Sequence, residues 1–195
     1  FVSDREIVVT SESKDATSVV FEQCILATGS KPVKLPFLPN DPRIITSTGA
    51  LDLGITKGRM LIIGGGIIGC EMATVYNALG MQVEVVEMLD QIMTGADPDL
   101  VKPFQKVLAS RGVVFHTNTR VTSVKSLSKE LRVSFEGNDA LPDVVGYDLI
   151  LQAVGRVPNS SDLDLDKAGV LLTDRGFVQA DSRSLRSSQS HIFAI

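Results

Sequence analysis

Three glycines and one acid form the pattern in this sequence that could do chemistry. Gly64, Gly66 and Gly69 are spaced as G-x-G-x-x-G directly after the apolar run 60–63, and Glu87 ends a second, β-branched run. In a β-α-β unit, such glycines let the chain turn and let the backbone approach a pyrophosphate, while such an acid accepts hydrogen bonds from ribose hydroxyls. The pattern therefore predicts a site for NAD.

The residues after Glu87 bear on which dinucleotide this site prefers. Met88, Leu89 and Asp90 follow it, and none of them is a cation. A carboxylate repels a 2′-phosphate, so we expect NAD to be preferred over NADP. The alternative is an ordinary glycine turn followed by a surface glutamate, but the strand and helix patterns around the motif favour the nucleotide site.

The segment between the glycines and Glu87 has the features of a helix over residues 67–79, ended by Gly80. Its first N–H groups have no intrahelical partner, and its dipole is positive at that end, so both favour a bound anion. The apolar residues expected to face the sheet are Ala73, Val75, Tyr76 and Leu79.

The remaining pattern predicts an α/β fold. Expected strands are 6–10, 18–27, 59–63, 82–87, 113–116, the antiparallel pair 120–127 and 131–136, 147–153, 176–180 and 191–195. Between the strands we expect an extended connector with regularly spaced prolines at 32–42 and a short helix at 49–53. A further helix should begin at Asp97 and Pro98 and end near Ser110. This order indicates a Rossmann-like domain with a parallel sheet and a β-meander, flanked by pieces of another domain. Its ligand should lie at the carboxyl ends of the parallel strands.

Composition excludes several classes of function. The 195 residues are 44% hydrophobic and carry a net charge of −4 without a basic cluster, so nucleic acid is not an expected partner. No apolar run approaches the ~20 residues of a membrane span. Cys24 and Cys70 are too few and too far apart to indicate a metal site or a disulfide framework. The start at Phe1 and the end on an apolar strand indicate a segment of a longer protein.

Several motifs together resemble the pyridine nucleotide–disulfide oxidoreductase family, and most closely its dihydrolipoamide dehydrogenase branch. They are ATGSKP at 27–32, GGGIIGCE at 64–71, VVEM at 85–88, VGRVPN at 154–159 and IFAI at 192–195. The resemblance covers nearly the whole chain. It implies that residues 1–45 are the tail of an FAD-binding domain with a crossover, 46–174 an NAD-binding domain, and 175–195 a return to the FAD-binding domain.

The resemblance also implies binding roles for individual residues. NAD would contact Gly64, Gly65, Gly66, Ile67 and Ile68 by its pyrophosphate, Glu87 by its ribose, Val121 by its adenine, and Glu71, Ala153, Val154, Gly155 and Arg156 by its nicotinamide. Gly69 would belong to the same NAD site and let the helix pack tightly on the strand. FAD would contact Thr28, Gly29 and Ser30. The family's redox disulfide, first flavin-binding loop and catalytic His–Glu pair are absent from this chain. No catalytic residue is therefore expected here, and His116 and His191 are not in the position of that histidine.

The implied activity of the parent protein is oxidation of dihydrolipoamide by NAD through FAD, in a homodimer that serves 2-oxo acid dehydrogenase complexes. The implied compartment is the bacterial cytoplasm or the mitochondrial matrix. Two alternatives stay open. One is another member of the family, such as mercuric or glutathione reductase, a transhydrogenase or an NADH oxidase. The other is a non-catalytic module that binds NAD(H).

Overall fold

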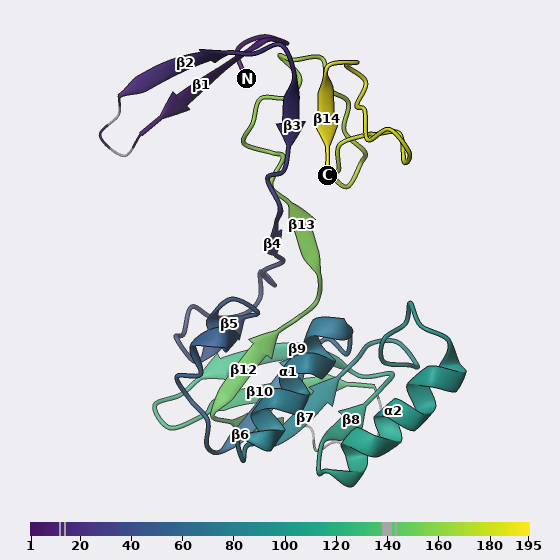
Figure 1. Ribbon diagram of the computed structural model, residues 1–195. Coiled ribbons are helices and arrows are strands. Elements are labelled where there is room, and N and C mark those ends of the chain that lie inside the picture. Colours follow the sequence, from purple (N-terminus) through teal and green to yellow (C-terminus); the bar gives the residue numbers. More distant parts are fainter. Residues whose placement is uncertain (12, 14, 138–141, 143) are drawn as a thin grey trace. The chain divides into compact units, whose positions relative to one another are not determined.

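The structure is a computed structural model and describes residues 1–11, 13, 15–137, 142 and 144–195. The chain forms two compact units. The central unit is Pro32–Gly155, and the flanking unit combines Phe1–Lys31 with Arg156–Ile195. Figure 1 shows the elements of both.

The central unit is built on a five-stranded parallel sheet in the order β5-β12-β6-β7-β8. The strands are β5 (Ile44–Thr46), β12 (Leu149–Gln152), β6 (Arg59–Ile63), β7 (Gln82–Val86) and β8 (Val114–His116). β6, β7 and β12 are apolar along most of their length, as expected for strands covered on both faces. Helices α1 (Ile67–Ala78) and α2 (Pro98–Ser110) and the 3-10 helix η1 (Gly49–Asp52) connect them.

Alternate residues of β6 face opposite sides of the sheet, which gives the unit three layers (Figure 1). Met60 and Ile62 pack with Ala73 and Tyr76 of α1 on one side. Leu61 packs on the other side against an antiparallel meander. The meander consists of β9 (Arg120–Ser126), β10 (Leu131–Glu136) and β11 (Val144–Tyr147).

The flanking unit consists of short strands around a smaller core. β1 (Glu6–Thr10) and β2 (Ala16–Val20) form a hairpin, and β3 (Cys24–Leu26) pairs in parallel with β14 (Ile192–Ala194) near the end of the chain. β4 (Ser30–Pro32) and β13 (Arg156–Pro158) pair where the chain passes between the units. Leu26, Leu165 and Ile192 are buried in the core of this unit.

The predicted α/β fold with a parallel sheet and a meander is confirmed. The boundaries between the two compact units, however, do not lie at the predicted positions 45/46 and 174/175. Residues 32–45 lie in the central unit because β5 pairs with β12 of its sheet. The chain leaves the central unit after Gly155 because the residues that follow pair with β4 and pack in the flanking core. The assignment of the flanks to an FAD-binding domain stays a prediction.

Four expectations about elements are wrong in detail. Residues 18–27 are not one strand but contain parts of two, β2 and β3. Residues 147–153 are not one strand either, because they run from the end of β11 across Asp148 into β12. Asp148, which is only partly buried between Tyr147 and Leu149, is the polar residue that marks this break. Residues 176–180 form only an isolated bridge at Val178. Val75 and Leu79 are exposed, because the buried stripe of α1 runs through Gly69, Cys70, Ala73 and Tyr76.

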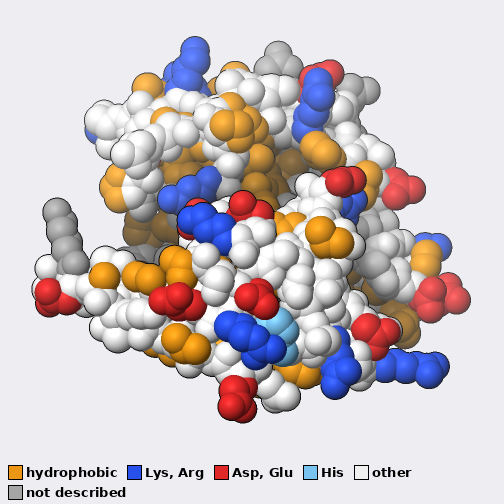
Figure 2. All heavy atoms as spheres, turned by 90° about the horizontal axis from the view of Figure 1, so that it is seen from above, with side chains coloured by type: hydrophobic (Ala, Val, Ile, Leu, Met, Phe, Trp, Pro, Cys, Tyr) orange, Lys and Arg blue, Asp and Glu red, His pale blue; other side chains and the backbone are white. Residues whose placement is uncertain are grey.

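Charge and apolarity on the surface agree with the composition. On the face in Figure 2, acidic and basic side chains are interspersed and form no single basic patch. Within the described ranges, no helix combines the length and apolarity needed to cross a bilayer. Among the same residues, no group of three or more His, Cys, Asp or Glu side chains converges as a metal site requires.

Candidate nucleotide site

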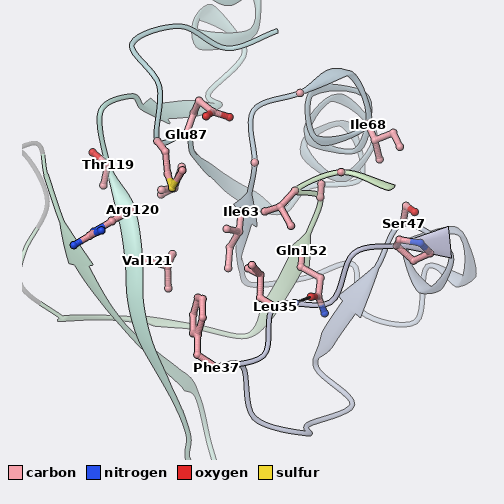
Figure 3. A pocket seen from close by; sticks show the side chains of 18 of the residues that line it. Leu35, Phe37, Ser47, Ile63, Ile68, Glu87, Thr119, Arg120, Val121 and Gln152 are labelled. Carbon is pink, nitrogen blue, oxygen red and sulfur yellow. Dashed lines mark hydrogen bonds between the residues drawn. The ribbon is translucent and has the colours of Figure 1, made fainter. Parts of the chain in front are cut away.

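A cavity of about 1010 Å³ lies at the carboxyl ends of β6, β7 and β12 in the central unit. This is the edge at which open parallel sheets bind ligands. The cavity is lined by Pro32, Leu35, Phe37, Ser47, Ile63, Gly64, Gly66, Ile67, Ile68, Val86, Glu87, Met88, Thr119, Arg120, Val121, Thr122, Gln152, Ala153, Val154 and Gly155. Figure 3 shows the side chains of Ile63, Glu87 and Val121 around this space. Its size is within the range of cofactor pockets.

The glycines of the motif serve different steric purposes. Gly64 has φ +105°, and a Cβ there would lie 2.5 Å from the Ala153 carbonyl oxygen, so the backbones after β6 and β12 meet closely. A Cβ at Gly69 would overlap the carbonyl oxygen of Gly64, so Gly69 lets α1 pack on the turn. A Cβ at Gly66 would meet no atom within 4 Å, and Gly66 lines the cavity. Gly66 therefore keeps open a surface that a ligand can approach.

The first turn of α1 points toward the same site. Gly66 is its N-cap, and no side chain caps the helix at this end. Ile67 and Ile68, the first two helical residues, line the cavity. The N–H groups of a first turn have no intrahelical acceptors and lie at the positive end of the dipole. This end of the cavity is suited to an anion such as a pyrophosphate.

Glu87 joins the end of β7 to the glycine turn. Its Oε2 accepts a hydrogen bond from the Gly65 N–H at 2.8 Å, and its Oε1 accepts one from the Leu89 N–H at 3.0 Å. An ionised carboxylate has about four acceptor positions, so each oxygen keeps one for a further donor. The two vicinal hydroxyls of a ribose are donors that match this remaining capacity.

Arg120 is a cation that sequence proximity to Glu87 did not reveal. It is the only Lys, Arg or His among the described residues that line the cavity. Its Nε and one terminal nitrogen bind Glu136 Oε2 at 3.0 and 2.6 Å, directly across the β9–β10 pair. Figure 3 shows its guanidinium directed away from Ile63 and Gln152. Glu136 therefore compensates part of the positive charge of Arg120 that a 2′-phosphate would need.

Cys70 lies under the turn and has no feature of a reactive cysteine. It is 1% exposed, and its Sγ is 3.4 Å from the Gly65 carbonyl oxygen. Burial, together with the charges of Glu87 and Glu71, raises the pKa of the thiol to about 11. The thiol therefore stays protonated at neutral pH and can donate to that carbonyl.

The structure gathers most, but not all, of the predicted nucleotide contacts. The cavity is lined by Gly64, Gly66, Ile67, Ile68, Glu87, Val121, Ala153, Val154 and Gly155. Gly65, Gly69 and Glu71 are not among its lining residues. Arg156 belongs to the flanking unit, where its Nε donates to Ser30 Oγ at 2.7 Å.

The predicted flavin contacts form a hydrogen-bonded turn in the flanking unit. Asn159 donates from its side-chain amide to the Thr28 carbonyl at 3.0 Å and from its backbone N–H to the Gly29 carbonyl at 3.0 Å. Gly29 has φ +66°, a left-handed conformation that favours glycine.

The connector supplies a part of the cavity wall that no sequence pattern indicated. Leu35 and Phe37 line the cavity, and the Leu35 N–H donates to Gln152 Oε1 at 2.9 Å. Gln152 is 6% exposed at the end of an otherwise apolar strand. A polar residue at the carboxyl end of a buried strand is the signal that could have placed it in the site. Thr119 and Thr122 could have been inferred from their position beside Val121.

Residues 1–195 match the sequence profile of the family described as pyridine nucleotide-disulphide oxidoreductase. The chain belongs to this family. It is 45% identical to the dihydrolipoyl dehydrogenase of Vibrio cholerae over 196 residues, which cover all of this chain and 41% of that protein. It is 45% identical to the Haemophilus influenzae dihydrolipoyl dehydrogenase, covering 40% of it. The chain thus spans about two fifths of the length of these relatives.

Solved structures of the family have the same fold. The HOCl-induced flavoprotein disulfide reductase RclA from Escherichia coli superposes with a TM-score of 0.88 at 25% identity, over all of this chain and 43% of RclA. LpdA from Mycobacterium tuberculosis gives 0.86 at 28% identity, over 97% of this chain and 40% of LpdA. The cofactors of this family are FAD and NAD(H).

The residues of the cavity fit a bound NAD. Gly66 leaves open space beside an uncapped helix N-terminus, Glu87 offers acceptors for ribose hydroxyls, and Val121 and Val154 supply apolar wall. These features line one cavity whose wall is largely apolar.

Proposed function

We propose that this chain is the NAD-binding segment of a flavin-dependent disulfide oxidoreductase, and that the whole protein is a dihydrolipoyl dehydrogenase, which converts dihydrolipoamide and NAD to lipoamide and NADH. One observation carries the nucleotide part of the proposal: the glycine turn and Glu87 open into the same cavity. The names of relatives that match the entire chain at up to 45% identity support the substrate.

In this proposal the chain binds and orients the nicotinamide coenzyme. The amides after Gly66 hold the pyrophosphate, Glu87 holds the adenosine ribose, and residues 153–155 hold the nicotinamide end. FAD, when bound, supplies a two-electron carrier between the thiol substrate and the nicotinamide. Holding the nicotinamide in one geometry removes much of the entropic cost of the hydride step.

In this proposal the flanking unit contributes residues that bind FAD. Residues 28–30, together with Asn159 and Arg156, form a hydrogen-bonded turn that we propose faces FAD. The further proposals from the resemblance are a homodimer, association with 2-oxo acid dehydrogenase complexes, and a location in the bacterial cytoplasm or the mitochondrial matrix.

The test separates binding from turnover. We expect the chain to bind NADH, detected by a change in NADH fluorescence, and to give no dihydrolipoamide-dependent NAD reduction by itself. The full-length protein should contain flavin by its absorbance spectrum and should reduce NAD with dihydrolipoamide. If the chain alone, with no added subunit, reduced NAD with dihydrolipoamide, the proposal that it only binds the coenzyme would be contradicted.

A second reading within the family follows from the fold match to a flavoprotein disulfide reductase. Under that reading, the full-length protein contains flavin and oxidises NADH with a disulfide acceptor but does not accept dihydrolipoamide. A full-length protein without flavin that still binds NADH would instead be a non-catalytic NADH-binding module.

A further inference from the structure

Gly65 is enclosed by four groups that we call the Gly65 clamp. Its N–H donates to Glu87 Oε2 at 2.8 Å, and its carbonyl accepts the Met93 N–H at 2.8 Å and faces the Cys70 thiol at 3.4 Å. A Cβ on Gly65 would lie 2.8 Å from Ile92 Cγ2, so the Ile92 side chain covers the remaining side. The clamp therefore holds both polar ends of one residue of the glycine turn.

The clamp draws its members from three separate segments. Glu87 directly follows β7, Cys70 belongs to the first turn of α1, and Ile92 and Met93 belong to the loop before α2. Ile92 is fully buried, and Met93 has φ +49°. Neither Gly65, Cys70 nor Ile92 is among the residues that line the cavity. Their effect on a ligand must therefore pass through the backbone of the turn.

Peptide planarity carries that effect to the cavity. The Gly65 carbonyl and the Gly66 N–H belong to one rigid trans peptide, in which the two groups point in opposite directions. When Met93 and Cys70 hold the carbonyl, the direction of the Gly66 N–H is fixed as well. Gly66 lines the cavity and begins the helix whose first amides suit an anion.

We propose that Cys70 is a positioning residue that presets the Gly66 N–H for the pyrophosphate of a dinucleotide through the Gly65 clamp. The proposal rests on the proposed NAD site and adds a residue that touches no ligand. It implies that loosening the clamp weakens ligands that contain a pyrophosphate and leaves recognition of adenosine unchanged.

The primary variant is Cys70→Ala, which removes one donor to the Gly65 carbonyl and changes little volume. Cys70→Ser restores a hydroxyl donor, and Ile92→Val keeps the β-branched methyl nearest Gly65. Cys24→Ala is the matched control, because Cys24 lies in β3 of the flanking unit. Circular dichroism and thermal melting of each variant establish that it is folded.

Two readouts are used together. Amide hydrogen exchange, followed by NMR without ligand, should be faster at Gly65 and Met93 in Cys70→Ala and unchanged in β6. The dissociation constant of ADP-ribose, from calorimetry, should rise about fivefold in Cys70→Ala, because part of the free energy of binding is then used to order the Gly66 N–H. The constant for adenosine, from ligand-detected NMR, should stay the same. Cys70→Ser, Ile92→Val and Cys24→Ala should resemble the wild type.

Three results would overturn the inference: unchanged exchange at Gly65 and Met93, unchanged ADP-ribose affinity despite faster exchange, or an equal loss of adenosine affinity. Failure of the proposed function gives a different result. In that case the wild-type protein binds neither ADP-ribose nor NADH, while exchange at Gly65 still responds to Cys70→Ala.

Discussion

Tyr147 donates a hydrogen bond to Glu84 Oε2 at 3.0 Å and so joins the meander to the parallel sheet. Tyr147 ends β11, and Glu84 lies in the middle of β7. The same carboxylate binds Arg59 at 2.7 Å and His116 at 3.3 Å. The Arg59 guanidinium also lies 5.0 Å from the centre of the Tyr147 ring. Three donors from three strands thus converge on one acid that is 15% exposed.

Tyr147→Phe should destabilise the central unit by about 1–2 kcal/mol, because a mostly buried carboxylate loses a charge-assisted donor. Urea unfolding measures this cost. Tyr76→Phe is a matched control, since Tyr76 donates to the neutral Ala50 carbonyl at 2.8 Å. The cost of Tyr147→Phe should shrink once Glu84 is protonated, whereas the cost of Tyr76→Phe should not. Equal pH dependence in the two variants would contradict this role of Glu84.

The stability of the protein should depend on Glu84 in acid. The hydrogen bond to His116, followed by those to Arg59 and Tyr147, lowers the pKa of Glu84 from 4.5 to about 2. Because the folded pKa is lower than the unfolded one, this stabilisation is complete above pH 4.5 and is lost as pH falls toward 2; it amounts to about 3 kcal/mol. The free-energy difference between wild type and Glu84→Gln should narrow over that window. If the free-energy difference between wild type and Glu84→Gln stayed constant from pH 6 to pH 2.5, this pH-dependent stabilisation by Glu84 would be excluded.

Gly66→Ala and Gly69→Ala should have opposite consequences. An alanine methyl at Gly66 meets no protein atom, and its φ of −73° suits any residue, so stability should change little. The methyl occupies the surface that a pyrophosphate approaches, so NADH affinity should fall about tenfold or more. At Gly69 the methyl overlaps the Gly64 carbonyl, so Gly69→Ala should lower the melting temperature. If a folded Gly66→Ala variant bound NADH with wild-type affinity, the pyrophosphate would not bind at this turn.

Glu87→Arg should shift preference from NAD toward NADP. The change removes a repulsive carboxylate and adds a cation beside the adenosine ribose, and the ratio of the NADPH and NADH dissociation constants should fall about tenfold or more. Glu87→Gln separates the two effects, because it removes the repulsion without adding a cation. In the wild type, pairing with Glu136 partly compensates the charge of Arg120. Fluorescence titration with NADH and NADPH measures the ratio, and an unchanged ratio in Glu87→Arg would contradict the ribose role.

The elements around the site could be predicted because local chemistry determines them. Gly80 has φ +100° next to the end of α1, and Pro98 begins α2, as their residue types indicate. The buried stripe of α1 could not be assigned in the same way, since Val75 and Leu79 are as apolar as the residues that pack. Only the position of the sheet decides which face of that helix is covered.

The less predictable part of the site depends on contacts between distant segments. Val121 could be assigned through resemblance, but Leu35 reaches the cavity because its N–H binds Gln152, 117 positions later. The pairing of Arg120 with Glu136 depends on the register of β9 and β10 and has no signal near Glu87. Such long-range pairs are set by the packing of the sheets and not by any local pattern.

The place of β12 has a consequence for how the protein is made. β12 is synthesised after β6, β7 and β8, yet it pairs between β5 and β6 and leads into the cavity wall at Ala153. Until Leu149–Gln152 has left the ribosome, β5 and β6 each expose an unpaired apolar edge. Such edges invite pairing with other chains. We therefore expect the nascent chain to be prone to aggregation until this strand has paired, and a chain stopped before it lacks the part of the cavity wall at Ala153.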